Sequence, residues 1–265
     1  MYDFVYTRPS SVAEAAKVLA KAGEDAVYLA GGQTLIPALK LRLRKPSVVV
    51  DLGALKGLDS IAENNDGVLI GALCTHASVA GNKLVKDRIP ALAALADGIG
   101  DPQVRNRGTL GGSIANADPA ADYPAAVVAL RAEIITDKRN IAGDSFFSGL
   151  FDTALETGEI VTAVKFRVPE KAAYVKFANP ASRFALVGIF VAKFKDEVRV
   201  AVTGAGASVF RVAEMERALA KSFTPAALDG IAVPADDLNS DMHAAAAYRA
   251  HLVSVLAKRA VTACG

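Results

Sequence analysis

The 265-residue sequence contains only two cysteines, Cys74 and Cys264, and only three histidines. Two thiolates are too few for a four-cysteine iron–sulfur cluster or for a cysteine-only zinc site. The histidines, at positions 76, 243 and 251, lack the spacing of metal ligands. We therefore expect no metal site and no iron–sulfur centre on this chain. No Ser/His/Asp set stands out either, so no catalytic residue is assigned.

Long apolar runs are also missing, although 52% of the residues are hydrophobic. Charged residues interrupt every stretch before it reaches the roughly 18 apolar residues that a membrane-spanning helix needs, so no membrane span is expected. The 30 basic and 28 acidic side chains nearly balance, which disfavours nucleic acid as a partner. The first residues lack the positive start and apolar core of a secretion signal, so we expect a cytoplasmic protein.

The first half of the sequence predicts a unit of strand, helix and strand. Ser11 precedes Glu14 with the spacing of a capping box, so a helix is expected to begin there and to end before Gly23. The segments that follow are expected to be a strand at 26–30, a helix at 34–39 and a strand at 47–52. Because this order gives a parallel pair, the intervening Gly31-Gly32 turn should lie where such sheets bind ligands.

The segment 98–124 is the most unusual part of the sequence, because glycine and proline recur throughout it. It predicts a long loop with little regular structure, and loops of this length are usually functional or disordered. Interleaved apolar residues such as Leu110 and Ile114 need burial, which favours an ordered, functional loop. Around it we expect strands at 68–70, 133–136 and 159–168 and helices at 78–96, 125–130 and 146–151.

The spacing of the expected strands changes at residues 169–171, which predicts a second domain. Closely spaced strands follow it, which is typical of an antiparallel meander, and two helices come after them. These strands are expected at 173–177, 186–194 and 198–203, and the helices at 212–221 and 242–262. We therefore expect an α+β protein with domains at 1–168 and 169–265, the first of them divided into subdomains at about 1–55 and 56–168.

Two glycine turns carry the strongest chemical signal. Gly31-Gly32 is followed by Gln33-Thr34, and Gly111-Gly112 lies between Thr109 and Ser113. Paired glycines beside a hydroxyl residue can offer several backbone N–H groups to a diphosphate with no Cβ in the way. A single pair is also typical of an ordinary tight turn, whereas two in one domain favour a dinucleotide held from both sides. Neither turn has the Rossmann or P-loop spacing.

The sequence around these turns resembles a known family. LAGGQTLIP together with GDPQVRNRGTLGGSIANADPAADYPA is similar to the FAD-binding, or medium, subunits of the molybdenum hydroxylases, which include carbon monoxide dehydrogenase and the xanthine dehydrogenase family. The resemblance covers essentially the whole chain. It implies a PCMH-type FAD-binding region of two α/β subdomains, followed by a small C-terminal domain with an antiparallel sheet and helices.

The resemblance also implies which residues contact FAD. Asp122 matches an acidic residue that contacts the cofactor, and a carboxylate in that place suits a ribose or ribityl hydroxyl, although Asp122 is also a candidate helix N-cap. Asn116 stands where many relatives carry histidine. Neither glycine motif contains cysteine or histidine, so the FAD is expected to be noncovalent. The implied cofactor-binding residues are Leu29, Ala30, Gly31, Gly32, Gln33, Thr34, Leu35, Ile36, Ile99, Thr109, Leu110, Gly111, Gly112, Ser113, Asp122, Ile160 and Lys176.

The function implied by the resemblance is electron transfer. The chain would take electrons from iron–sulfur clusters on a small partner subunit, which receives them from a large molybdopterin subunit, and pass them through FAD to an external acceptor. A dimer of such heterotrimers is expected. Two alternatives stay open, a free-standing flavin-dependent oxidase of similar fold and a nonredox nucleotide-binding module. Arg105 and Arg107 are candidates for contact with the diphosphate or with a partner, and valine at Gly32 or Gly111 is expected to block FAD binding while the fold survives.

Overall fold

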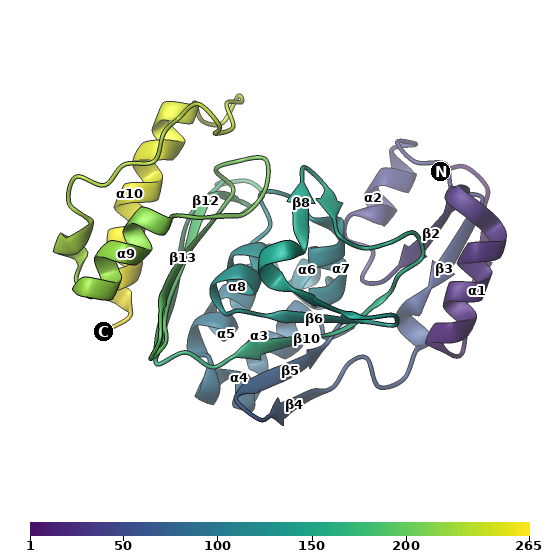
Figure 1. The fold of residues 1–265 in the computed structure, drawn as a ribbon. Coiled ribbons are helices and arrows are strands. Elements are labelled where there is room, and N and C mark those ends of the chain that lie inside the picture. The colour runs from purple at the N-terminus through teal and green to yellow at the C-terminus, as the bar shows by residue number, and fades with distance from the viewer.

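The protein consists of three blocks of secondary structure that follow one another along the chain (Figure 1), and the computed structural model describes all residues from 1 to 265. The N-terminal block is a parallel sheet in the order β1-β3-β2, with helices on the crossovers. Its elements are β1 (Val5–Thr7), α1 (Val12–Ala22), β2 (Ala26–Leu29), α2 (Leu35–Lys40) and β3 (Val48–Asp51). The predicted strand–helix–strand unit with a parallel pair is therefore confirmed.

The start of α1 follows the predicted capping box in one half only. The Ser11 hydroxyl accepts a hydrogen bond from the Glu14 N–H at 3.2 Å, as the spacing predicts. The Glu14 carboxylate, however, accepts from the N–H and the hydroxyl of Ser10, each at 2.7 Å, instead of from the backbone of Ser11. Further along the helix, Ala15 and Leu19 are its buried residues, and Ala15 packs with Val50 in a small core beneath the sheet.

The middle block is a five-stranded sheet with helices packed against it. Its strands follow the order β4-β5-β10-β6-β7, and every neighbouring pair is antiparallel. These strands are β4 (Ile61–Asn64), β5 (Gly67–Gly71), β6 (Glu133–Thr136), β7 (Asn140–Ala142) and β10 (Val161–Arg167). The helices are α3 (His76–Gly81), α4 (Lys83–Arg88), α5 (Pro90–Asp97), α6 (Pro102–Arg105), α7 (Leu110–Asn116) and α8 (Tyr123–Ala129).

Three predictions for this block were wrong. The expected helix at 78–96 is three short helices, because Asn82 caps α4 and Pro90, which has no N–H, can only begin a helix. The expected loop at 98–124 contains α6 and α7, whose N-caps Asp101 and Thr109 accept hydrogen bonds from Val104 N–H and Gly112 N–H. Its richness in glycine and proline concealed these capping signals.

The expected helix at 146–151 is instead a β-hairpin of β8 (Phe147–Gly149) and β9 (Asp152–Thr153). Phe151 closes the hairpin in the left-handed region, with φ 53°. A bulky residue rarely adopts that conformation, so the local sequence did not predict a turn at this position.

The C-terminal block is a four-stranded antiparallel sheet in the order β11-β12-β13-β14 with two helices on its outer face. Alternate residues of β12 reach different cores. Val187, Ile189 and Val191 pack in the outer core with the helices, whereas Phe190 and Ala192 pack in the core of the middle block. The predicted meander is confirmed. Its elements are β11 (Lys171–Ala178), β12 (Ala185–Lys193), β13 (Val198–Thr203), β14 (Phe210–Arg211), α9 (Ala213–Lys221) and α10 (Ala246–Ala263).

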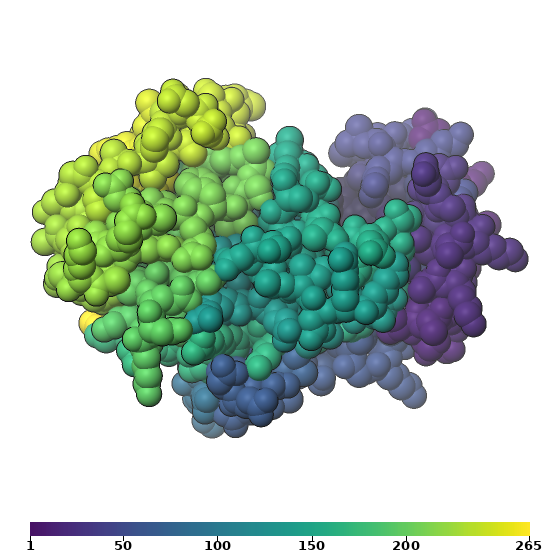
Figure 2. Space-filling view, viewed as in Figure 1, coloured from purple at the N-terminus to yellow at the C-terminus, as the bar shows by residue number.

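The blocks are packed tightly side by side, as the space-filling view shows from the purple N-terminal part to the yellow C-terminal part (Figure 2). The first sheet lies within residues 5–51, the five-stranded sheet within 61–167 and the last within 171–211. A division into folding units near residues 55 and 168 stays a proposal. None of the helices combines the length and hydropathy of a bilayer-spanning segment.

Candidate functional site

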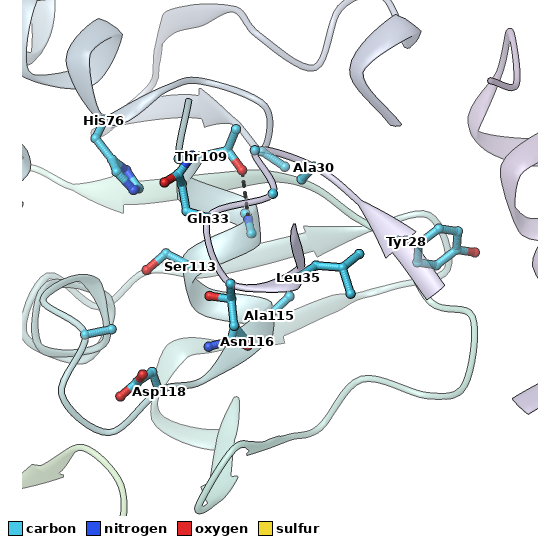
Figure 3. Close-up of a pocket in the computed structure, with 18 of the residues that line it drawn as sticks. Tyr28, Ala30, Gln33, Leu35, His76, Thr109, Ser113, Ala115, Asn116 and Asp118 are labelled. Atoms are coloured by element: carbon cyan, nitrogen blue, oxygen red, sulfur yellow. Dashed lines mark hydrogen bonds between the residues drawn. The ribbon is translucent and has the colours of Figure 1, made fainter. Parts of the chain in front are cut away.

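A cavity of about 480 Å³ lies where the three blocks meet. The β2–α2 turn of the N-terminal block forms one wall, α3 and α7 of the middle block form another, and Ser182, Arg183 and Phe184 between β11 and β12 reach its edge. Cavities of roughly 300–1,000 Å³ are typical of small-molecule and cofactor sites. Thr109, Ser113, Ala115 and Asn116 appear along the α7 side of the cavity in Figure 3, near Gln33 and Leu35 of the first turn.

The first glycine turn lines this cavity and carries a row of free backbone donors. The N–H groups of residues 31–35 donate no hydrogen bond within the chain, although the carbonyls of Gly32 and Thr34 accept from Ile36 and Ala38. Gly32 has φ 75°, a conformation in which glycine is preferred. Consecutive free N–H groups ahead of a helix form a concave, positively polarised surface that suits an anion.

The two glycine turns lie in direct contact with each other. A Cβ on Gly31 would fall 2.1 Å from the carbonyl oxygen of Arg107 and 2.8 Å from the Cα of Gly108. A Cβ on Gly112 would lie 3.5 Å from that of Ala30. Close approach of the N-terminal and middle blocks therefore requires glycine at position 31.

The second turn uses its backbone donors inside the protein. The N–H groups of Leu110, Gly111, Gly112 and Ser113 donate to the oxygens Cys74 O, Ala72 O, Thr109 Oγ1 and Thr109 O, at 2.8–3.1 Å. The N–H groups of the second turn are therefore not free for a diphosphate, contrary to the prediction, whereas those of the first turn are free. What the second turn presents to the cavity is side chains, namely Thr109 and Ser113 with Asn116 one turn further along α7.

Asp122 lies at the cavity wall in a buried polar cluster. Its Oδ1 accepts from the Tyr174 hydroxyl at 2.6 Å and from Lys176 Nζ at 2.8 Å, and no other residue donates to Oδ2. Burial raises the pKa of Asp122, while the Lys176 ammonium and the Tyr174 hydroxyl oppose that rise. Its side chain makes no cap bond to α8. Oδ2 is therefore available as an acceptor for a ligand hydroxyl.

Lys176 lies outside the cavity lining and bonds only to groups of the chain. Its ammonium donates to Asp122 Oδ1, to the Gly98 carbonyl at 2.9 Å and to the Arg183 carbonyl at 2.8 Å. An ammonium has three N–H donors, so all of them are used within the chain, and Lys176 does not line the cavity. It connects β11 to the end of α5, the start of α8 and the loop that carries Arg183.

The other residues implied by the family resemblance divide between the cavity and the core behind it. Ile99 and Ile160 are apolar wall residues, whereas Leu110 is fully enclosed in the middle core. Leu29 and Ile36 do not line the cavity, and both side chains pack close to Gly32. Of the residues implied by the resemblance, those that line the cavity are Ala30, Gly31, Gly32, Gln33, Thr34, Leu35, Ile99, Thr109, Gly111, Gly112, Ser113, Asp122 and Ile160.

The two candidate arginines do not line the cavity. Arg105 donates to the carbonyls of Ile99 and Gly100 at 3.0 and 3.1 Å and lies 3.8 Å from Asp97, so it shapes the chain before α6. The basic side chains at the cavity are instead Arg44 and Arg183. They lie outside both glycine motifs, so local sequence patterns did not single them out.

Sequence reasoning also missed Tyr28 and Glu159 at the far end of the cavity. Burial raises the pKa of Tyr28 to about 12, and its hydroxyl donates to the Gly158 carbonyl at 3.0 Å. The Arg139 guanidinium donates to both carboxylate oxygens of Glu159 at 3.1 Å and lowers its pKa to about 2. Together these bonds fix the segment that carries Ile160.

The Cys74 thiol is buried. Burial raises the pKa of the Cys74 thiol to about 11, so it stays protonated at neutral pH. No group of three or more His, Cys, Asp or Glu side chains is arranged to hold a metal ion. The residues that line the cavity bring backbone N–H groups, hydroxyls, amides and two arginines, which suit binding of a phosphorylated ligand.

Comparison with known proteins agrees with this geometry. Residues 2–170 match the family described as "FAD binding domain in molybdopterin dehydrogenase". The chain is 35% identical to the carbon monoxide dehydrogenase medium chain of Hydrogenophaga pseudoflava, over 98% of this chain and 96% of that one. It is also 35% identical to the nicotine 6-hydroxylase medium subunit of Paenarthrobacter nicotinovorans, with the same coverage of each chain.

A solved structure, reconstituted CO dehydrogenase from Oligotropha carboxidovorans, contains a chain of the same fold. The TM-score is 0.90 at 31% sequence identity, with 99% of this chain and 98% of that chain covered. The predicted fold class is therefore confirmed. The chain belongs to the FAD-binding medium subunits of the molybdenum hydroxylase family, which are components of oxidoreductases.

Proposed function

We propose that the cavity holds the FAD diphosphate against the first glycine turn. The free N–H groups of residues 31–35 are the observation that carries this proposal, because a diphosphate needs several donors converging on it. Arg44 and Arg183 would add positive charge at the cavity. From the second turn, Thr109 and Ser113 would contribute hydroxyl donors.

The remaining wall residues would position the rest of the cofactor. Asp122 Oδ2 would accept from a ribityl or ribose hydroxyl, since Oδ1 is already occupied by Tyr174 and Lys176. Ile99 and Ile160 would give apolar contact and exclude water. Lys176 would position Asp122 and the loop at Arg183 without touching the cofactor. Binding would be noncovalent, because no cysteine lines the cavity and neither glycine motif contains cysteine or histidine.

When bound, FAD supplies chemistry that the chain's own side chains lack, because it exchanges electrons both singly and in pairs. We propose that the chain is the electron-transfer subunit of a multi-subunit molybdenum hydroxylase. Electrons would come from iron–sulfur clusters on a small partner subunit, which draws them from a large molybdopterin subunit, and leave for an external acceptor. The assembly would be a cytoplasmic dimer of heterotrimers. Both relatives are named as the medium chain or medium subunit of their enzymes, which supports this assignment.

Co-purification tests the electron-transfer role. The tagged chain, expressed in its native host, should bring down two further subunits in a preparation that contains iron, molybdenum and flavin. Adding the organic substrate of that preparation should bleach its flavin absorbance under anaerobic conditions. A flavin-loaded chain that purifies alone and turns over a substrate by itself would instead establish a free-standing oxidase. A chain that binds nucleotides but no flavin would establish a nonredox module.

A further inference from the structure

His76, at the start of α3, is a buried polar residue at the cavity that the family resemblance did not assign. It is 5% exposed and lines the cavity. Its backbone N–H donates to the Gly108 carbonyl at 3.0 Å, and its Nε2 would lie 2.5 Å from a Cβ on Gly108. Because Gly108 also packs against Gly31, the imidazole is held close to the first glycine turn.

Both nitrogens of this imidazole lack a hydrogen-bond partner in the chain, but their surroundings differ. Nδ1 is fully enclosed, and so is the hydroxyl of Tyr123, which also has no partner. The two rings are 5.4 Å apart between centroids. Nε2 is not enclosed in this way and His76 lines the cavity, where Figure 3 shows its ring extending toward Gln33 and Thr109.

The enclosed pair determines where the proton of the imidazole resides. Buried polar atoms are almost always hydrogen-bonded, directly or through an ordered water. Burial raises the pKa of Tyr123 far above its usual value, so its phenol remains an O–H donor. The two enclosed atoms belong to neighbouring rings, so the phenol can serve as the donor and Nδ1 as the acceptor. With Nδ1 as the acceptor, a neutral imidazole carries its single proton on Nε2.

The groups around His76 keep the imidazole neutral. Burial, together with a smaller contribution from the Arg105 guanidinium of α6, lowers its pKa to about 4. Tyr123 of α8 is uncharged. Asp122 and Cys74 raise the pKa of Tyr123, but neither of them shifts the pKa of His76. No carboxylate therefore stabilises an imidazolium at this position.

We propose that His76 is a cofactor-binding residue that donates Nε2–H to an oxygen of the bound flavin nucleotide, and that Tyr123 fixes the required tautomer. The inference rests on the proposed binding of FAD in this cavity. The acceptor is an oxygen near the first glycine turn, either of the diphosphate or of the flavin half of the cofactor. Titrations with FAD and with ADP separate these two sources, because ADP has the diphosphate but no flavin.

Affinity of the FAD-free chain for FAD is the first test. His76→Phe keeps a ring against Tyr123 but removes the donor, and one hydrogen bond corresponds to roughly a 10-fold weaker Kd. His76→Gln places an amide N–H near the position of Nε2 and should restore the affinity to within about 3-fold of wild type. His251→Gln, on the exposed side of α10, is the matched control and should change nothing.

Nitrogen NMR of histidine-labelled protein is the second test and does not depend on how well His76→Phe folds. The chain has only three histidines, so His76→Gln assigns the signals. We expect Nδ1 unprotonated and Nε2 protonated between pH 8 and 5, with the Nε2 signal shifting when FAD binds. A proton on Nδ1, or an unchanged Nε2 signal in FAD-loaded protein, would overturn the inference. Wild-type protein that binds no FAD would instead refute the proposed function on which it rests.

Discussion

Gly31→Ala tests the contact between the two glycine turns. The new Cβ would lie 2.1 Å from Arg107 O and 2.8 Å from both Arg107 C and Gly108 Cα. All three atoms belong to the backbone, so no side-chain rotation relieves the overlap and the two turns must separate. The φ of Gly31 is not in the left-handed region, so the whole cost comes from this overlap.

We expect Gly31→Ala to lower the free energy of unfolding by about 3 kcal/mol, the upper end of typical overpacking costs. For a chain of this size that corresponds to a fall in Tm of roughly 6–12 °C. FAD affinity should fall at least about 10-fold, because the free N–H groups move with the turn.

Thermal unfolding and FAD titration of the same preparation measure both effects. Gly81→Ala is the control, since its Cβ would meet nothing within 4 Å and helix propensity favours alanine. A Gly31→Ala protein with wild-type Tm and wild-type FAD affinity would show that the turns do not pack as described.

Two further predictions concern buried ionisable groups. Lys176→Met leaves the buried Asp122 carboxylate with only the Tyr174 hydroxyl and should lower the free energy of unfolding, measured in urea, by about 3–5 kcal/mol. The double variant with Asp122→Asn should recover part of that loss. Strictly additive effects of the two substitutions would argue against an Asp122–Lys176 interaction. The pKa of His76 lies at about 4 in the folded chain and near 6.5 in the unfolded one, so the unfolded state takes up a proton first as pH falls. Between pH 6.5 and 4, the stability of the FAD-free chain should therefore drop by about 2.5 kcal/mol more in wild type than in His76→Gln. Parallel stability curves for the two proteins would contradict a neutral His76.

The sequence predicted the N-terminal unit and the C-terminal meander well because their hydrophobic patterns are local. Strand 186–194 has apolar residues on both faces, and the structure buries both of them. The prediction for segment 98–124 was wrong because its short helices are specified by the caps Asp101 and Thr109, whereas glycine and proline dominate its composition. The hairpin at 147–153 was not predicted because a phenylalanine occupies its left-handed position.

Within the site, sequence motifs located the two turns but not the way they work. Gly111 was expected to make room for a diphosphate, yet a Cβ there would meet Ala72 at 2.6 Å, and its N–H already donates to the carbonyl of Ala72. Gly111→Val should therefore damage the fold as well as FAD binding, contrary to that expectation. Such roles depend on contacts between segments far apart in the chain, as do those of Arg183 and His76.

Flavin content of the purified chain is the most direct measurement of the central claim. The protein should show the visible absorbance bands of a flavin, or acquire them on addition of FAD, at one FAD per chain. Acid precipitation should release all of that flavin into the supernatant, as noncovalent binding requires. A chain that gains no flavin absorbance even with excess FAD would contradict the claim that the cavity between the two glycine turns is an FAD site.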